Sequence, residues 1–256
     1  MARRVSSARP ILCAVLDSAA LVRSPRTARE AAASLFAAGV DWIQLRDRSL
    51  PTRELFALAC DLVAARDAAR GTRPGLRVIV NKRSDVALAA GADGVHLGID
   101  AADARSLAAL FRALRIDTGI PGDFLIGASL HSVAELEALI AHGLPLAYAQ
   151  LAPIWSPRSK PAERPALGLA ALARAAELAA GAKIELLAQG GLDTGRAVQA
   201  ITAGAAGIAV TGSLSQASDP VAATRSLRRA LDLQDECESD ASERTQRART
   251  EGDPPR

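Results

Sequence analysis

Short apolar segments rich in Val, Ile and Leu alternate with longer amphipathic segments along most of the chain. Apolar runs without polar alternation are typical of strands that other structure covers on both faces. The pattern predicts eight strands, at Ile11–Asp17, Asp41–Arg46, Arg77–Asn81, Gly94–Gly98, Phe124–Ser129, Leu146–Ile154, Lys183–Gly191 and Gly207–Ser213. It predicts a helix after each, at Thr27–Ala38, Pro51–Arg70, Ser84–Ala90, Ala102–Leu114, Val133–His142, Leu169–Ala180, Thr194–Ala203 and Pro220–Leu233.

An eightfold repeat of strand and helix favours an α/β fold with a single (β/α)8 barrel, the TIM barrel. The 256 residues are close to the ~250 of one such barrel. A doubly wound open sheet has the same alternation, but no GxGxxG sequence follows the first strand. We expect an N-terminal arm at residues 1–10, the barrel at 11–233, and a disordered charged tail at 234–256, where apolar residues are almost absent.

The net charge of +3 is unevenly placed, because residues 234–256 hold seven acidic and four basic side chains and leave +6 for the rest. A mildly basic body suits anionic small molecules, whereas a nucleic-acid partner would require much denser Lys/Arg clustering. Cys13, Cys60 and Cys237 have no metal-site spacing. No apolar run could form a signal-peptide core or a membrane span, so we expect a cytoplasmic protein with no membrane partner. The oligomeric state stays open, a homo-oligomer included.

Polar residues and glycines gather where the predicted strands end. In a TIM barrel these carboxyl ends surround the active site; an Arg there suits phosphate, and glycines let backbone N–H groups approach an anion. Individually, Arg46 and Arg48 could be surface ion-pair residues, and His96 a core histidine. Their shared position instead predicts a site for a phosphorylated small molecule. The candidates are Gln44, Arg46, Arg48, Asn81, His96, Ser129, His131, Ser159, Lys160, Gly190, Gly191, Thr211 and Gly212.

Seven stretches in serial order carry a family resemblance: Gln44–Arg48, Val80-Asn81, Ala92–Gly98 (ADGVHLG), Gly127–Ser132 (GASLHS), Pro153–Lys160, Ala188–Gly191 and Gly207–Val210 (GIAV). On these stretches the chain, from about Ile11 to Leu233, resembles the thiamine-phosphate synthase/TenI family. The resemblance implies a transferase of thiamine biosynthesis. That enzyme condenses 4-amino-2-methyl-5-(diphosphomethyl)pyrimidine with thiazole phosphate and releases thiamine phosphate and diphosphate.

The resemblance also implies roles for the candidate residues. The pyrimidine diphosphate would be held by Gln44, Arg46, Asn81, Ser129 and Lys160, with Arg48 in the position of a family lysine. The thiazole phosphate would be held by Gly191 and the backbone near Gly212, and Ser159, Gly190 and Thr211 complete the substrate-binding set. The catalytic candidates are His131, Lys160 and Arg46.

The metal positions depart from the family pattern. Synthases of the family hold Mg²⁺ with two Asp residues, and the corresponding positions here are Lys82 and Ala101. A lysine is a cation where a ligand to a cation should be. Asp100 is the remaining metal candidate, but a shift of one residue need not restore the near-octahedral geometry that Mg²⁺ requires. The family therefore suggests a Mg²⁺ cofactor, while these residues argue against its usual site.

Three functions agree with these residues. The first is a synthase that is independent of metal or altered in its use, in which Lys82 replaces part of the metal's charge; the retained Gln44 and Lys160 favour it. The second is a TenI-type thiazole tautomerase, an isomerase without Mg²⁺, with His131 as general acid and base. The third is a non-catalytic regulator that binds thiazole phosphate. A sugar-phosphate epimerase would share the phosphate site but would need a carboxylate or metal set that we cannot place.

Overall fold

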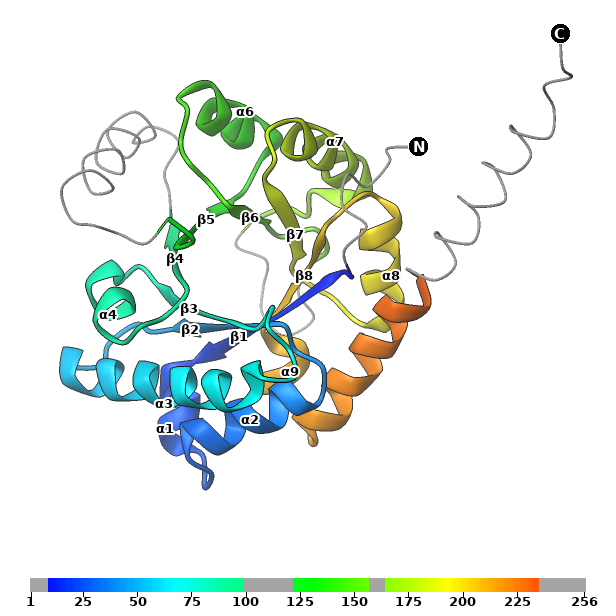
Figure 1. The fold of residues 1–256 in the computed structure, drawn as a ribbon. Coiled ribbons are helices and arrows are strands. Elements are labelled where there is room, and N and C mark those ends of the chain that lie inside the picture. Colours follow the sequence, from blue (N-terminus) through cyan, green and yellow to red (C-terminus); the bar gives the residue numbers. More distant parts are fainter. Residues whose placement is uncertain (1–8, 99–121, 157–163, 235–256) are drawn as a thin grey trace, which may run out of the picture.

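The computed structural model, which describes residues 9–98, 122–156 and 164–234, contains a closed barrel of eight parallel strands (Figure 1). The strands pair in chain order, and β8 pairs with β1 to close the ring. The predicted TIM barrel is confirmed. The strands are β1 (Ile11–Asp17), β2 (Trp42–Arg46), β3 (Arg77–Asn81), β4 (Gly94–Gly98), β5 (Leu125–Leu130), β6 (Tyr148–Leu151), β7 (Glu185–Gln189) and β8 (Gly207–Val210).

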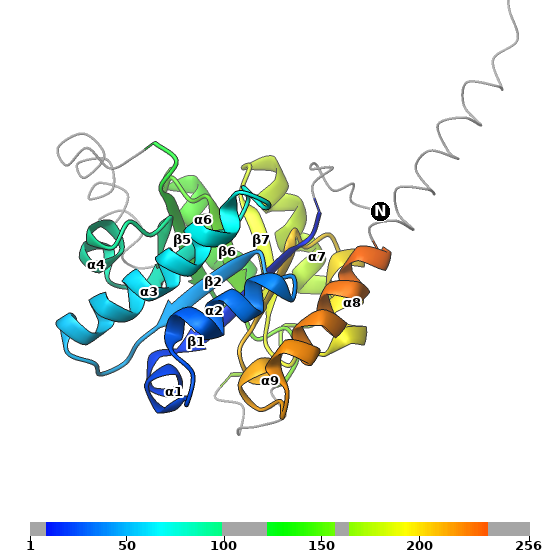
Figure 2. The ribbon, with the colours of Figure 1, turned by 60° about the horizontal axis from the view of Figure 1, so that its bottom comes forward.

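Helices surround the barrel, and Figures 1 and 2 both place helix 220–234 (orange) beside α8. The others are α1 (Ser18–Arg23), α2 (Ala28–Ala37), α3 (Thr52–Arg70), α4 (Ser84–Ala89), α6 (Val133–Ala141), α7 (Gly168–Gly181), α8 (Thr194–Thr202) and α9 (Gly212–Ser215). The short α1 and α9 were not predicted. The predicted helix Ala102–Leu114, most of the N-terminal arm and nearly all of the predicted tail lie outside the described residues. No helix in the described ranges is long and apolar enough to cross a membrane.

Three strands end earlier than predicted, which lengthens the loops on the carboxyl side of the barrel. β6 ends at Leu151, shortly before Pro153, which has no N–H to donate. β7 ends at Gln189 because Gly190 and Gly191 have φ values of +97° and +64°, outside the range of a strand. β8 ends at Val210 because the chain turns directly into α9.

The amino-terminal half of the barrel interior is filled by side chains. The Tyr148 ring is fully buried there and meets Trp42 edge to face, with ring centroids 5.1 Å apart. On β5, a Cβ at Gly127 would lie 2.0 Å from the Tyr148 ring, so only a glycine leaves room for it. Other interior residues are Cys13, Val15, Ile79, Leu187 and Ala209. Open space therefore remains only toward the carboxyl ends of the strands.

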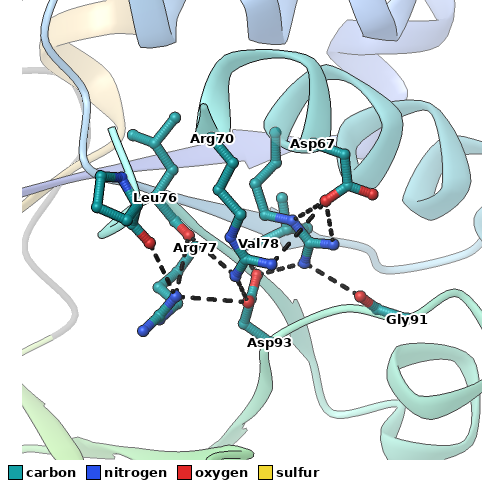
Figure 3. Close-up of polar contacts among 9 residues, drawn as sticks. Asp67, Arg70, Leu76, Arg77, Val78, Gly91 and Asp93 are labelled. Atoms are coloured by element: carbon teal, nitrogen blue, oxygen red, sulfur yellow. Dashed lines mark hydrogen bonds and ion pairs between the residues drawn. The ribbon is translucent and has the colours of Figure 1, made fainter. Parts of the chain in front are cut away.

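Asp93, the acidic residue of the ADGVHLG stretch, joins α3 to the amino ends of β3 and β4 (Figure 3). It lies just before β4, and its carboxylate accepts hydrogen bonds from Arg66, from Arg70 and from the Val78 N–H at 2.8 Å. The Arg77 guanidinium lies 3.8 Å away. Asp93 is thus a structural residue, on the end of the barrel opposite to the site described next.

Candidate functional site

A cavity of about 920 Å³ opens at the carboxyl ends of the strands. Strand pairing places its polar walls: Asn81 is in register with His96, and Ser129 is in register with Gly98 and Gln150. Side chains of registered residues project from the same face of a sheet. Most of the predicted set lines this cavity: Gln44, Arg46, Asn81, His96, Ser129, Gly190, Gly191, Thr211 and Gly212.

A buried hydrogen-bonded chain runs from the packed interior to the cavity. His96 Nδ1 lies 3.1 Å from the Tyr148 hydroxyl, and His96 Nε2 lies 2.8 Å from Ser129 Oγ. Burial lowers the pKa of His96 to about 3, so its ring is neutral at pH 7 and has one donor and one acceptor nitrogen. If Tyr148 donates to Nδ1, then Nε2 donates to Ser129, and the Ser129 hydroxyl can donate to an anion in the cavity.

Two buried side-chain atoms in the cavity wall lack hydrogen-bond partners among the described residues. They are Nε2 of Gln44, on β2, and Oδ1 of Asn81, at the end of the neighbouring β3. A buried polar atom without a partner costs about 1–3 kcal/mol, which a bound ligand would recover. The wall therefore offers one donor and one acceptor to a polar ring.

Arg46 brings positive charge to the mouth of the barrel. It is the only cation among the described residues that line the cavity. Its nearest carboxylate oxygen in that part of the chain, on Asp17, is 3.7 Å from Nη1, which is a loose ion pair. Partial burial and the like charge of Arg48 lower the pKa of Arg46. A bound anion would compensate both effects. Arg48 is exposed and does not line the cavity.

Two carbonyl groups of the loop after β7 accept hydrogen bonds from residues that do not line the cavity. The Gly191 carbonyl accepts a hydrogen bond of 2.6 Å from Arg196, and the Gly190 carbonyl accepts one of 3.3 Å from the Trp155 N–H. The Arg196 guanidinium also lies over the Trp155 ring. In the described structure, the N–H groups of Gly191 and Leu192 have no acceptor.

The loop after β8 lies against the loop after β7. Ser213 Oγ donates a hydrogen bond of 2.5 Å to the Leu192 carbonyl. Thr211 lies directly before α9, and the N–H groups of Gly212 and Ser213 have no acceptor within the described ranges. Free N–H groups in the loops after strands seven and eight are the usual phosphate site of TIM barrels.

The remaining predicted residues divide into two groups. His131 does not line the described cavity: its Nδ1 donates to the Ala152 carbonyl at 2.9 Å, and its N–H bonds the Glu135 side chain. Lys82 is exposed at the end of β3. Ser159, Lys160, Asp100 and Ala101 lie outside the described residues, so their roles stay predictions.

Sequence reasoning missed several polar residues of the cavity wall, among them Gln150, Gln189 and Asp193. Gln150 is buried on β6, two residues after Tyr148, and so faces the same interior side of the barrel. The alternation of inward and outward positions, extended along β6 and β7, would have found both glutamines.

The barrel and its cavity define a class: a TIM-barrel enzyme with backbone N–H groups that are free in the described structure after β7 and β8, and an arginine and two amide side chains on β2 and β3. A family model described as thiamine monophosphate synthase matches residues 12–214, and the chain belongs to that family.

Curated relatives and a solved structure agree with this assignment. The thiamine-phosphate synthase of Methanoculleus marisnigri is 40% identical over 206 residues, 79% of this chain and 87% of that protein. The Roseiflexus sp. thiamine-phosphate synthase is 36% identical over 74% of this chain and 72% of its own length. A structure of thiamine phosphate pyrophosphorylase from Pyrococcus furiosus superposes with a TM-score of 0.67 at 25% identity, and the match covers 88% of this chain and 96% of that one.

Proposed function

We propose that this chain is a thiamine-phosphate synthase that joins the pyrimidine diphosphate to thiazole phosphate. The observation that carries the proposal is a pair of anion sites in one cavity. Arg46 lies on β2, and the free N–H groups of Gly191 and Gly212 follow β7 and β8. In the eight-stranded ring β2 lies two strands from β8 and three from β7, so the two groups occupy different parts of the same mouth. A cavity of about 920 Å³ is of the size that binds small molecules, and two phosphorylated substrates could meet in it.

The pyrimidine fits the side of the cavity formed by β2 and β3. Gln44 Nε2 would donate to a ring nitrogen, and Asn81 Oδ1 would accept from the exocyclic amino group. Arg46 and the Ser129 hydroxyl would then contact the diphosphate. Ser159 and Lys160, from the loop after β6, and Arg48 complete this proposed substrate set.

The reaction exchanges one bond for another. The bond between the methylene carbon and the diphosphate oxygen breaks, and its electron pair leaves with the diphosphate. The lone pair of the thiazole nitrogen then forms a C–N bond to the resulting pyrimidine-methyl cation. Donors fixed in advance around the departing anion, here Arg46 and Ser129, stabilise the charge that develops. Holding the two substrates in one cavity supplies the proximity.

This chemistry requires no proton transfer at the thiazole nitrogen. A tautomerase, by contrast, requires a general acid and base at its substrate. The cavity-facing histidine, His96, is buried, neutral and bonded through both nitrogens, and His131 does not line the cavity in the described structure. The described geometry therefore favours the synthase. The cytoplasmic location and the absence of a nucleic-acid partner stay predictions.

Two parallel assays on purified protein test the proposal. In the first, the pyrimidine diphosphate and thiazole phosphate are supplied together, and thiamine phosphate is measured by its oxidation to a fluorescent thiochrome. In the second, the thiazole carboxylate tautomer is supplied alone and its aromatisation is followed by absorbance. We expect thiamine phosphate in the first and no turnover in the second. Tautomer turnover without condensation would refute the proposal.

A further inference from the structure

Lys82 occupies a rare backbone conformation at the edge of the site. Its φ is +65°, and the Arg83 N–H donates to the Asn81 carbonyl at 2.9 Å, so Lys82 is the centre of a three-residue γ-turn. The form with positive φ is uncommon and strained for a residue with a side chain. The Lys82 N–H meanwhile remains bonded to the His96 carbonyl at 2.7 Å, which fixes the turn to the end of β4. Strain of this kind is concentrated at functional sites.

The turn places the end of the lysine side chain beside Gly98, at the carboxyl end of β4. Gly98 is in register with Ser129, so a side chain at position 98 would project from the same face of the sheet as the Ser129 hydroxyl. A Cβ built on Gly98 would meet the Lys82 Cε at 3.6 Å, which places the end of the lysine on that side. No carboxylate in the described ranges pairs with its ammonium group. The end of the lysine thus lies beside the carboxyl end of β4, without a carboxylate partner from those ranges.

The same place is where the family resemblance implies Mg²⁺, and the described residues there do not fit that ion. The described residues at the carboxyl end of β3 are Asn81, Lys82 and Arg83, and those at the end of β4 are residues 96–98. Neither set contains a carboxylate. No group of three His, Cys, Asp or Glu residues in the described ranges could hold a metal. Mg²⁺ takes oxygen ligands, and a lysine ammonium is a competing cation. Ala101, at the second ligand position, has no donor atom in its side chain.

We propose that the Lys82 ammonium binds the diphosphate of the pyrimidine substrate and supplies the positive charge that other family members draw from Mg²⁺. This rests on the proposed function. Lys82 and Arg46, on neighbouring strands, would contact the leaving group together, while Ser129 donates from β5. The bond changes are those already given, and the electron pair departs with a diphosphate neutralised by side chains of the chain itself. The synthase accordingly turns over without a divalent ion.

Binding of inorganic diphosphate tests the charge directly. Isothermal titration calorimetry in EDTA would compare the wild type with Lys82→Gln, which keeps most of the length of the side chain but removes its charge. Loss of one charged contact should weaken binding about 10- to 100-fold. Lys183→Gln is the matched control, because Lys183 is also exposed and has a φ of +59°, but it precedes β7 at the opposite end of the barrel. Its affinity should equal that of the wild type.

Turnover separates this inference from the proposed function. We expect wild-type thiamine phosphate formation to persist in EDTA, and Lys82→Gln to lose activity while unfolding at the same temperature as the wild type. Two results would overturn the role of Lys82. One is that diphosphate binds only when Mg²⁺ is added; the other is that Lys82→Gln and the wild type bind diphosphate with equal affinity. Diphosphate binding that depends on Lys82, without condensation under any condition, would refute the synthase and leave Lys82 as an anion-binding residue.

Discussion

The neutral state of His96 predicts a specific loss of stability in mild acid. In the unfolded chain a histidine takes up a proton below about pH 6.5, whereas burial keeps the pKa of the folded His96 near 3. Between these values the unfolded state binds the extra proton, so the contribution is fully present above about pH 6.5 and falls as the pH falls. Each pH unit is worth ~1.4 kcal/mol, which gives a loss of about 2 kcal/mol in the free energy of unfolding at pH 5.

Urea denaturation at constant ionic strength, at pH 7.5, 6 and 5, measures this loss. The glutamine of His96→Gln cannot titrate in this range, so the free energy of unfolding of the variant should fall about 2 kcal/mol less than that of the wild type between pH 7.5 and 5. The variant should also be less stable than the wild type at every pH.

The reasoning fails if the wild type and His96→Gln lose equal stability between pH 7.5 and 5. It fails equally if the His96 ring titrates near pH 6.5 by NMR in the folded protein. Either result would mean that His96 can hold a proton beside Ser129, and the hydrogen-bonded chain beneath the cavity would need a different arrangement.

Three further substitutions test separate parts of the structure. Asp93→Asn leaves the buried Arg66 with only the exposed Asp67 as a charge partner and should lower the free energy of unfolding by about 3–5 kcal/mol in urea, with KM for both substrates unchanged. Gly191→Ala would place a Cβ 2.8 Å from the Ser156 carbonyl oxygen. In steady-state kinetics, the KM for thiazole phosphate should rise above its wild-type value by a larger factor than the KM for the pyrimidine diphosphate. Arg46→Gln should lower kcat about 10²–10³-fold in the condensation assay, with little change in melting temperature.

Each of these has a result that would contradict it. An Asp93→Asn variant that unfolds like the wild type would remove Asp93 from the structural network. A Gly191→Ala variant whose KM rises equally for both substrates would argue against a thiazole phosphate site in that loop. Wild-type turnover in Arg46→Gln would place the departing diphosphate elsewhere.

The sequence predicted the barrel because each strand and helix carries a clear local signal. It also predicted most of the cavity wall, since the carboxyl ends of barrel strands converge and Gln44 and Arg46 share one side of β2. Gln150 was missed because it lies inside the apolar run of β6 and not in the loop after it; its spacing from Tyr148 and its register with Ser129 show that it faces inward.

Other features depend on three-dimensional contacts that no local pattern encodes. The four residues of α9 are too few for a helical periodicity, and their helix follows from the turn at Thr211. Asp93 lies in a stretch that resembles the family's site, yet its partners on α3 are more than 20 residues away in sequence. The orientation of the Lys82 side chain depends on a γ-turn and on the absence of a side chain at Gly98, which it lies beside.

A crystal structure of the protein with thiamine phosphate and diphosphate, grown in EDTA, would test the central claim most directly. The account predicts both products in the one cavity. The diphosphate should contact Arg46, Lys82 and Ser129, and the phosphate of thiamine phosphate should accept hydrogen bonds from the N–H groups of Gly191 and Gly212. Products bound with the two anions exchanged, or outside the carboxyl end of the barrel, would contradict it.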